Sequence, residues 1–424
     1  MRSGWTVFLR GLLVATALLL GSCGGGGVGD GGGAGGGDVA AGGTDIGGGG
    51  IGSGGTGVAS GGGEGVGSGG TGITPVASVG TVDGFGSIVV NGIRYDIATA
   101  RVLLSDAPAL KLGMTVNVFG NVEPSLAQGT ATLVVSAADL RGTVSALDPG
   151  RGTFDVLSLH VSTDASTVYG GGLASLAGLA NGSAVQVYGL PGDNGSLHAT
   201  RIERLGAPGD LVVAGTATGL DARAATFRIG GLTVRFGNAS FPADWPVTSL
   251  AGNPVVRVRG SLSGNVLVAT SIEPWAPVIP AEGTKLSLTG QVSDFMELRA
   301  LRIEGVPADV SQAQLGGSGS LLQLANGVRV EATGTVRGGV LVVTKLKIRE
   351  TAPSQATVTY SAQGSVGGFR SAASFKVQGQ DIDASQAVFV GGTAQDLDSR
   401  SKVRVTGTRV VDDVLLAERV EFLE

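Results

Sequence analysis

The stretch Leu-Asp-Ser-Arg-Ser-Lys-Val-Arg-Val-Thr-Gly, residues 397–407, decides the fold of this chain. It places a Leu ahead of Val-x-Val-x-Gly at a fixed distance. The same spacing recurs at residues 110–120, 179–189, 250–260 and 324–334, with Ala332 in place of the second Val in the last of these. Recurrence at a fixed spacing indicates a tandem array of one structural unit.

Around each copy the sequence predicts five short strands. A hairpin precedes the motif, as in Phe227-Arg-Ile229, Gly230-Gly231 and Leu232-Thr-Val234, where apolar residues alternate on either side of a two-residue turn. The equivalent turns are Asn91-Gly92, Glu304-Gly305 and Gln378-Gly379. The second unit has Leu157-Ser158 there, and we expect a looser hairpin in that unit.

The motif itself predicts a fourth strand. Alternation turns both Val side chains inward, and we expect the Leu to close one end of a barrel and the Gly to form a turn. The residues between the two Val side chains should then point outward to solvent: Asn117, Gln186, Arg257, Glu331 and Arg404. A fifth strand follows, with the pattern Leu-x-Ala-x-x-Ile.

Five antiparallel strands, with the longest connection between the third and the fourth, predict an all-β fold of tandem small OB-like Greek-key barrels. We expect five units, at residues 79–140, 141–204, 214–273, 288–350 and 361–424. Units one and two follow each other directly and should be fixed together. The later units are separated by Pro-bearing stretches, which we interpret as stiff spacers: Leu205–Val213, Pro274–Ser287 and Thr351–Tyr360.

The N-terminus carries a targeting signal. Arg2 and Arg10 form a positive segment before an apolar run at residues 11–20 that is too short to span a bilayer. Leu20-Gly21-Ser22-Cys23 then resembles the lipobox of bacterial lipoproteins, which implies cleavage after residue 22 and lipidation of Cys23. Gly24 follows in place of the Asp that retains such proteins at the inner membrane, so the resemblance implies an outer-membrane lipoprotein. An ordinary secretory signal with an unrelated Cys is the alternative.

Residues 23–78 form a Gly-rich linker, in which Gly is the majority residue from Gly24 to Gly72. Such a segment buries too little apolar surface to offset its ordering entropy, so we expect a disordered tether. It contains two GxGxxG strings, at Gly50 and Gly65. A dinucleotide site needs a strand before the glycines and a helix after them, so we attribute both strings to composition.

Composition excludes several function classes. The formal net charge is −5, with 15% charged and 4% aromatic residues, so we expect no nucleic-acid partner. The single Cys excludes an intrachain disulfide and a thiolate metal cluster. We predict no cofactor and no metal: the acidic pairs Asp381/Asp383, Asp396/Asp398 and Asp412-Asp413 lack EF-hand spacing, and the last reads as a turn.

The residues that carry chemistry are few. His160 and His198 are the only His, and we interpret both as exposed surface side chains without a catalytic partner. No GxSxG, HExxH or GxxxxGK string occurs, so we predict no catalytic residues and a non-enzymatic protein. The candidate ligand-binding residues are Phe241, Trp245 and Trp275, since exposed aromatics could bind a saccharide. The alternative is that the first two fill the core and that Trp275 packs at a unit junction.

The stretch Gly84-Phe85-Gly86-Ser87-Ile88-Val89-Val90-Asn91-Gly92, downstream of Gly-Gly-Thr-Gly repeats, resembles an uncharacterised family of bacterial lipoproteins. Those proteins carry tandem OB-like repeats known only as a domain of unknown function. The resemblance implies an exported, lipid-anchored, all-β protein and brings no functional residues. We therefore expect a cell-envelope interaction or spacer module that is anchored to the membrane through its lipid and binds an envelope protein or glycan. A carbohydrate-binding module is the alternative.

Overall fold

The computed structural model describes residues 74–123, 128–192, 195–275, 282–303, 306–316, 320–326, 328–350 and 358–424. The predicted leader at residues 1–22, Cys23 and nearly all of the predicted linker lie outside these residues. The described chain begins with strand β1 at Thr74, inside the stretch that we predicted to be linker.

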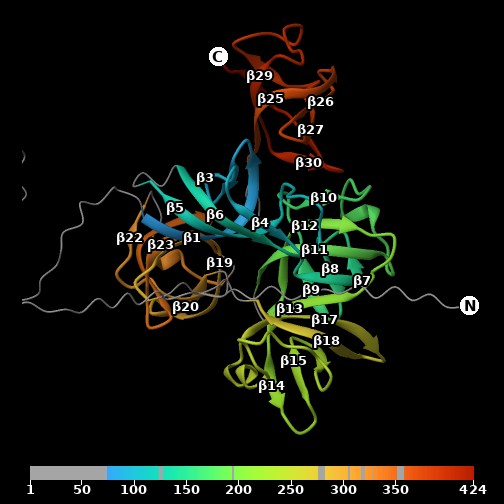
Figure 1. The fold of residues 1–424 in the computed structure, drawn as a ribbon, viewed down its shortest axis with the longest axis vertical. Coiled ribbons are helices and arrows are strands. Elements are labelled where there is room, and N and C mark those ends of the chain that lie inside the picture. Colours follow the sequence, from blue (N-terminus) through green and yellow to red (C-terminus); the bar gives the residue numbers. More distant parts are fainter. Residues whose placement is uncertain are drawn as a thin grey trace, which may run out of the picture. The chain divides into compact units, whose positions relative to one another are not determined.

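Five repeats follow one another along the chain, each in its own colour band in Figure 1. Repeat 1 contains β1 (Thr74–Phe85), β2 (Ile88–Val90), β3 (Ile93–Asp96), β4 (Arg101–Leu104), β5 (Thr115–Val122) and β6 (Gln128–Ser136). Repeat 2 contains β7 (Leu140–Asp148), β8 (Thr153–Val156), β9 (Leu159–Ser162), β10 (Val168–Gly170), η1 (Leu176–Gly178), β11 (Ala184–Pro191) and β12 (Leu197–Arg204).

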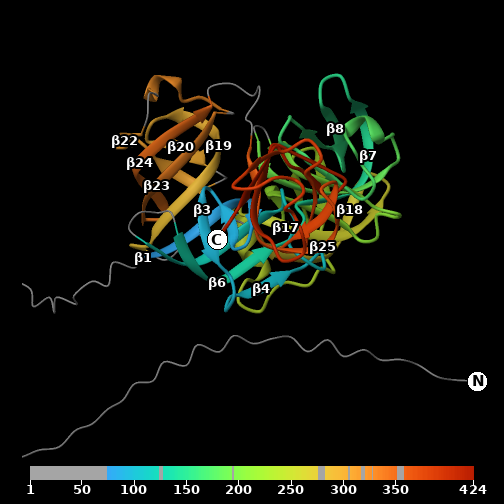
Figure 2. The same cartoon turned by 90° about the horizontal axis from the view of Figure 1, so that it is seen from above.

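Repeats 3 to 5 have the same elements with small variations. Repeat 3 contains β13 (Leu211–Thr216), β14 (Thr218–Asp221), β15 (Thr226–Ile229), β16 (Leu232–Arg235), η3 (Val247–Gly252), β17 (Val255–Ser263) and β18 (Val266–Pro274). Repeat 4, drawn from above in Figure 2, contains β19 (Lys285–Glu297), β20 (Ala300–Ile303), β21 (Val306–Asp309), β22 (Gln314–Leu315), η4 (Leu321–Gln323), β23 (Arg329–Arg337) and β24 (Val340–Glu350). Repeat 5 contains β25 (Tyr360–Ser371), β26 (Ser374–Val377), β27 (Gln380–Asp383), β28 (Val388–Val390), β29 (Lys402–Gly407), β30 (Arg409–Val411), β31 (Val414–Leu416) and β32 (Arg419–Phe422).

The strands of each repeat close into a barrel. In repeat 2, β7 pairs with β8 and β8 with β9, all antiparallel. Strands β9 and β10 then run parallel to β12, β12 pairs with β11, and β11 returns to β7. The other repeats close in the same order. The predicted all-β fold of tandem OB-like barrels is confirmed.

The hairpin of repeat 2 is as tight as the others, so the expectation of a looser turn is wrong. Val156 pairs with Leu159 directly across the turn. Leu157 and Ser158 take φ angles of 52° and 62°, like Asn91 and Gly92 at 57° and 76° in repeat 1. This left-handed region strains residues other than Gly and Asn. Leu157 offsets the strain by burying its side chain in the core.

The apolar residues of the motif line the barrels as predicted. The first motif Val is at most 2% exposed in every repeat, and the second apolar residue at most 1%. The motif Leu is buried in repeats 2 to 5, at 1–6% exposed. In repeat 1 Leu110 is only partly buried, and Leu112, at 1% exposed, lies fully in the core.

The repeated Gly has a different role from the predicted turn. In repeats 1 to 4 it lies within the hairpin of the last two long strands, where the register shifts by a bulge. A Cβ added to Gly120, Gly189, Gly260, Gly334 or Gly407 would lie closer than 3.0 Å to a carbonyl oxygen of the facing strand. The motif therefore requires Gly because two backbones approach each other closely, and no left-handed angle is involved.

Gly407→Ala should destabilise repeat 5 by about 2–3 kcal/mol, because the new Cβ overlaps the Leu416 carbonyl and forces the strands apart. Gly367→Ala, in the same repeat, is the matched control: its Cβ would meet nothing within 4 Å, so its effect should stay within about 0.5 kcal/mol. Chemical denaturation of both variants checks this. Equal losses would contradict the steric argument.

Two pairs of repeats share a core, and repeat 4 has its own. One cluster of buried apolar residues spans repeats 2 and 3, a second is built mainly from repeats 1 and 5, and a third lies within repeat 4. The predicted spacer Leu205–Val213 is wrong at its C-terminal end, because β13 begins at Leu211 and pairs with both β17 and β7. Burial between repeats explains this: a barrel of this size buries too little surface by itself.

Candidate functional site

Two of the five side chains predicted to face solvent are buried. Gln186 is 2% exposed and Arg257 is 1% exposed. Both point away from their own barrel, as the alternation requires, but they point into a junction between repeats. The expectation of a solvated outer face is therefore wrong at these positions, and the junction concentrates polar chemistry.

The centre of this junction is Asp106, in the segment between β4 and β5, with a side chain only 1% exposed. Its carboxylate accepts hydrogen bonds from Arg141 of repeat 2 at 2.7 Å and from Arg259 of repeat 3 at 2.8 Å. Arg257 and the Ala138 N–H also donate to it. Burial alone raises the pKa of this carboxyl, but the guanidinium groups of Arg257 and Arg259 outweigh burial and hold the pKa below its usual value.

Asp106→Asn should lower the stability of the joined repeats by about 3–5 kcal/mol, because it leaves buried guanidinium groups without their anion. Asp381→Asn is the matched control, since Asp381 pairs with Lys376 at 2.7 Å while both side chains are about half exposed. That pair should contribute at most about 1 kcal/mol. Unfolding curves for both variants decide between the values, and a small loss for Asp106→Asn would show that the network is not stabilising.

A second ionic cluster joins repeats 1, 2 and 5. Arg201 is 0% exposed and donates to Glu203 at 2.6 Å and to Asp413. Lys111 of repeat 1 lies 2.9 Å from Asp413 and 3.1 Å from Glu203. Asp413 is held by a tight turn between β30 and β31, which confirms the turn predicted at Asp412-Asp413. The C-terminal repeat is thus tied to residues far earlier in the chain.

Asp139 is a third buried acid, 8% exposed, at the boundary between repeats 1 and 2. It accepts hydrogen bonds from the Trp275 indole N–H at 2.7 Å, the Gly189 N–H at 2.9 Å and the Thr115 hydroxyl at 3.2 Å. Burial raises the pKa of the Asp139 carboxyl to about 6, although these hydrogen bonds and the charge of Arg257 act against the rise. Arg257 also lies over the Trp275 ring, 5.1 Å from its centroid.

The raised pKa of Asp139 predicts a pH effect of definite sign. Because the folded chain holds this proton more tightly, the group stabilises the fold most below the unfolded pKa of 3.8, and this contribution is lost as pH rises through 6. Relative to Asp139→Asn, the wild type should gain about 2.4 kcal/mol between about pH 7.5 and pH 4. Asp106 acts in the opposite direction in both proteins and cancels from the difference. Parallel stability profiles for the two proteins would contradict the assignment.

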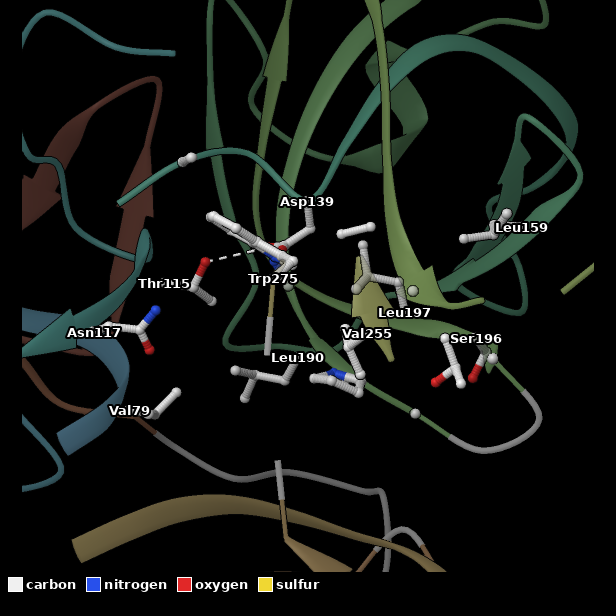
Figure 3. Close-up of a pocket in the computed structure, with 18 of the residues that line it drawn as sticks. Val79, Thr115, Asn117, Asp139, Leu159, Leu190, Ser196, Leu197, Val255 and Trp275 are labelled. Atoms are coloured by element: carbon white, nitrogen blue, oxygen red, sulfur yellow. Dashed lines mark hydrogen bonds between the residues drawn. The ribbon is translucent and has the colours of Figure 1, made fainter. Parts of the chain in front are cut away.

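Asp139 and Trp275 line a cavity of about 170 Å³, the junction cavity (Figure 3). Its walls come from four repeats, including Asn117 of repeat 1, Leu190 of repeat 2, Val255 of repeat 3 and the Asp294–Arg302 pair of repeat 4. Most of the remaining lining side chains are aliphatic. A cavity with apolar walls and a few convergent polar groups has the properties of a small-molecule site.

The structure separates the three aromatic residues predicted as ligand candidates. Phe241 and Trp245 stack on each other, with ring centroids 6.1 Å apart and an interplanar angle of 26°. Both are half-buried and pack against the core shared by repeats 2 and 3. Neither lines the junction cavity, whereas Trp275 does. The sequence singled out Trp275 as a ligand candidate, placed Asn117 only among the outward positions of the repeated motif, and did not mark Asp139.

The two His differ in environment. His160 is exposed as predicted and lies 3.0 Å from Asp155. His198 is not: its side chain is 14% exposed, with Nε2 3.1 Å from the Asp164 carboxylate and Nδ1 3.2 Å from the Ser162 hydroxyl. Burial raises the pKa of Asp164, but the hydrogen bond and charge of His198 outweigh it and hold the pKa at about 2.

Ser162, His198 and Asp164 form a Ser–His–Asp line of contacts. His198 therefore has partners that the sequence did not reveal. Ser162 and His198 are cross-strand neighbours in the parallel pair of β9 and β12. Neither of them lines the junction cavity. We therefore interpret the line as a contact that fixes these two strands.

The described residues contain no group of three or more His, Cys, Asp and Glu side chains placed to hold a metal ion. The acidic pairs act locally: Asp396 accepts from Thr393, and Asp398 from Arg400 and Ser401. Among the helices in the described ranges, none has both the length and the apolar character needed to cross a membrane.

Comparison with known families tests the repeat assignment. Residues 141–203, 214–273 and 363–421 each match a family described as a domain of unknown function, DUF5666. These matches cover three of the five repeats. Repeats 1 and 4 close in the same strand order as the three matching repeats. The predicted tandem repeats of a domain of unknown function are confirmed for these three repeats. No curated protein and no solved structure matches the chain.

Proposed function

We propose that this protein is a non-enzymatic, lipid-anchored interaction module of the bacterial cell envelope. Cys23 carries the lipid, the Gly-rich linker tethers the folded repeats, and the DUF5666 array forms a binding platform for an envelope protein or glycan. The observation that carries the proposal is that buried charged side chains connect the repeats. Asp106, Arg201 and Arg257 hold repeats to one another, which favours a rigid platform.

The lipobox resemblance supports the membrane address. A lipid at Cys23, followed by Gly24, directs the protein to the outer membrane. A Gly-rich chain of this length reaches about 35–42 Å on average. That distance allows the array to face its partner without contact between the repeats and the bilayer.

Labelling with radioactive palmitate in a bacterial host tests this anchor. The wild type should incorporate the label and fractionate with the outer membrane, and Cys23→Ala should lose both properties. Ser22→Ala is the matched control, because it keeps a small side chain before the Cys and should retain label and location. Palmitate that persists in Cys23→Ala would refute the anchor.

Carbohydrate binding is the second candidate function. It is favoured by the junction cavity, which combines an indole ring with amide and hydroxyl groups between apolar walls. The stacked pair Phe241 and Trp245 offers a competing location on repeat 3.

A further inference from the structure

We propose that the junction cavity binds one ring of a neutral saccharide, with the Asn117 amide and the indole of Trp275 as its main contacts. The inference rests on the second candidate function and names its site. It places the site between repeats, away from Phe241 and Trp245.

The size of the cavity sets the size of the ligand. The cavity measures about 170 Å³. A cavity of about 150 Å³ accommodates a six-membered ring such as benzene, whereas one water needs only about 10–15 Å³. There is therefore room for a single ring, and the rest of a longer ligand would have to extend outside.

The polar groups of the lining indicate hydrogen bonding to a ligand. Asn117 is half-buried, and its side chain forms no hydrogen bond with any other residue that the structure describes. Ser196 lines the same cavity, and within the described ranges its hydroxyl also has no partner (Figure 3). An amide offers two donors and an acceptor, and a hydroxyl offers one donor and two acceptor sites. Hydroxyl groups of a ligand satisfy both.

The charges of the lining disfavour an anionic ligand. Asp139 already accepts three hydrogen bonds. Asp294 and Arg302 lie 3.2 Å apart and neutralise each other at a more exposed position. No other described residue lining the cavity carries a charge. An anion would enter beside the Asp139 carboxylate without a counter-charge and would lose its hydration, so a neutral ligand is favoured over an anionic one.

The indole of Trp275 supplies the apolar surface. Arg257 covers one part of the ring at 5.1 Å from the centroid and does not line the cavity, while Trp275 does. The indole N–H is fixed by Asp139, so the ring cannot rotate away. A fixed aromatic surface in the same cavity as an amide matches a sugar ring, which has apolar C–H faces and polar hydroxyl edges.

Ligand-observed NMR and calorimetry on the full chain provide the test. The probes are neutral monosaccharides (glucose, galactose, mannose and N-acetylglucosamine), their short oligomers, glucuronate as a charged sugar and cyclohexanol as an apolar ring. At least one neutral sugar should bind saturably, and more tightly than glucuronate or cyclohexanol. Binding of monosaccharides indicates a soluble ligand, and binding of oligomers alone indicates the end of a glycan chain.

Two cavity variants and one control locate the site. Asn117→Leu keeps the side-chain size and should weaken sugar binding about tenfold, and Ser196→Ala should weaken it less. Trp245 lies outside the cavity, so Trp245→Ala should leave sugar binding unchanged. Thermal unfolding of each variant confirms that the fold is intact.

The outcomes separate this inference from the function on which it rests. Sugar binding that survives Asn117→Leu but is lost in Trp245→Ala would keep the carbohydrate function and refute the cavity as its site. Preference for cyclohexanol or glucuronate, or the absence of saturable binding to any neutral sugar by folded wild-type protein, would refute the inference altogether.

Discussion

The arrangement of this protein depends on one carboxylate. Asp106 belongs to repeat 1, yet the guanidinium groups that bind it come from repeats 2 and 3. At 1% exposure its side chain has lost its water, and only these cations make its charge tolerable in the interior. The three repeats must therefore meet in one geometry for the network to form. The same contacts between repeats fix the walls of the junction cavity.

Buried ion pairs are a poor source of net stability, because desolvation offsets much of the attraction. Their value here is geometric. The shared apolar clusters between repeats supply a non-directional attraction, which would tolerate many relative orientations. Hydrogen bonds accepted by Asp106 and donated by Arg201 to Asp413 have directions and fixed partners. The apolar surface holds the repeats together, and the ionic clusters select one orientation.

The barrel itself was predictable from the sequence because strand alternation reports directly which side chains face inward. The buried motif Val residues, the two-residue hairpins and the Asp412-Asp413 turn follow from local chemistry. Alternation cannot distinguish an outward face that meets water from one that meets another repeat. For this reason Gln186 and Arg257 were misassigned to solvent. The motif Gly was predicted as a turn because its role depends on a facing strand that the local sequence does not contain.

The candidate site was less predictable for a related reason. Trp275 attracts notice as a rare aromatic residue, but Asn117 and Asp139 are ordinary residues in strand-like surroundings. They acquire a role only where repeats distant in sequence come together. His198 shows the same limit, because its partners Ser162 and Asp164 lie on a neighbouring strand segment.

Divergence of the outward motif positions has a physical consequence. If the repeats had identical outer faces, every junction would have the same chemistry, and any repeat could pack against any other. Here the equivalent positions hold Asn117, Gln186, Arg257, Glu331 and Arg404. Gln186 and Arg257 each fit one junction, while Arg404 forms its contacts inside repeat 5, with Gln363 and Glu421. A mispaired junction would bury a charge without its partner, which is strongly unfavourable. The repeats can therefore share one interior and still assemble in a single order, and the differences among them are what shape the cavity.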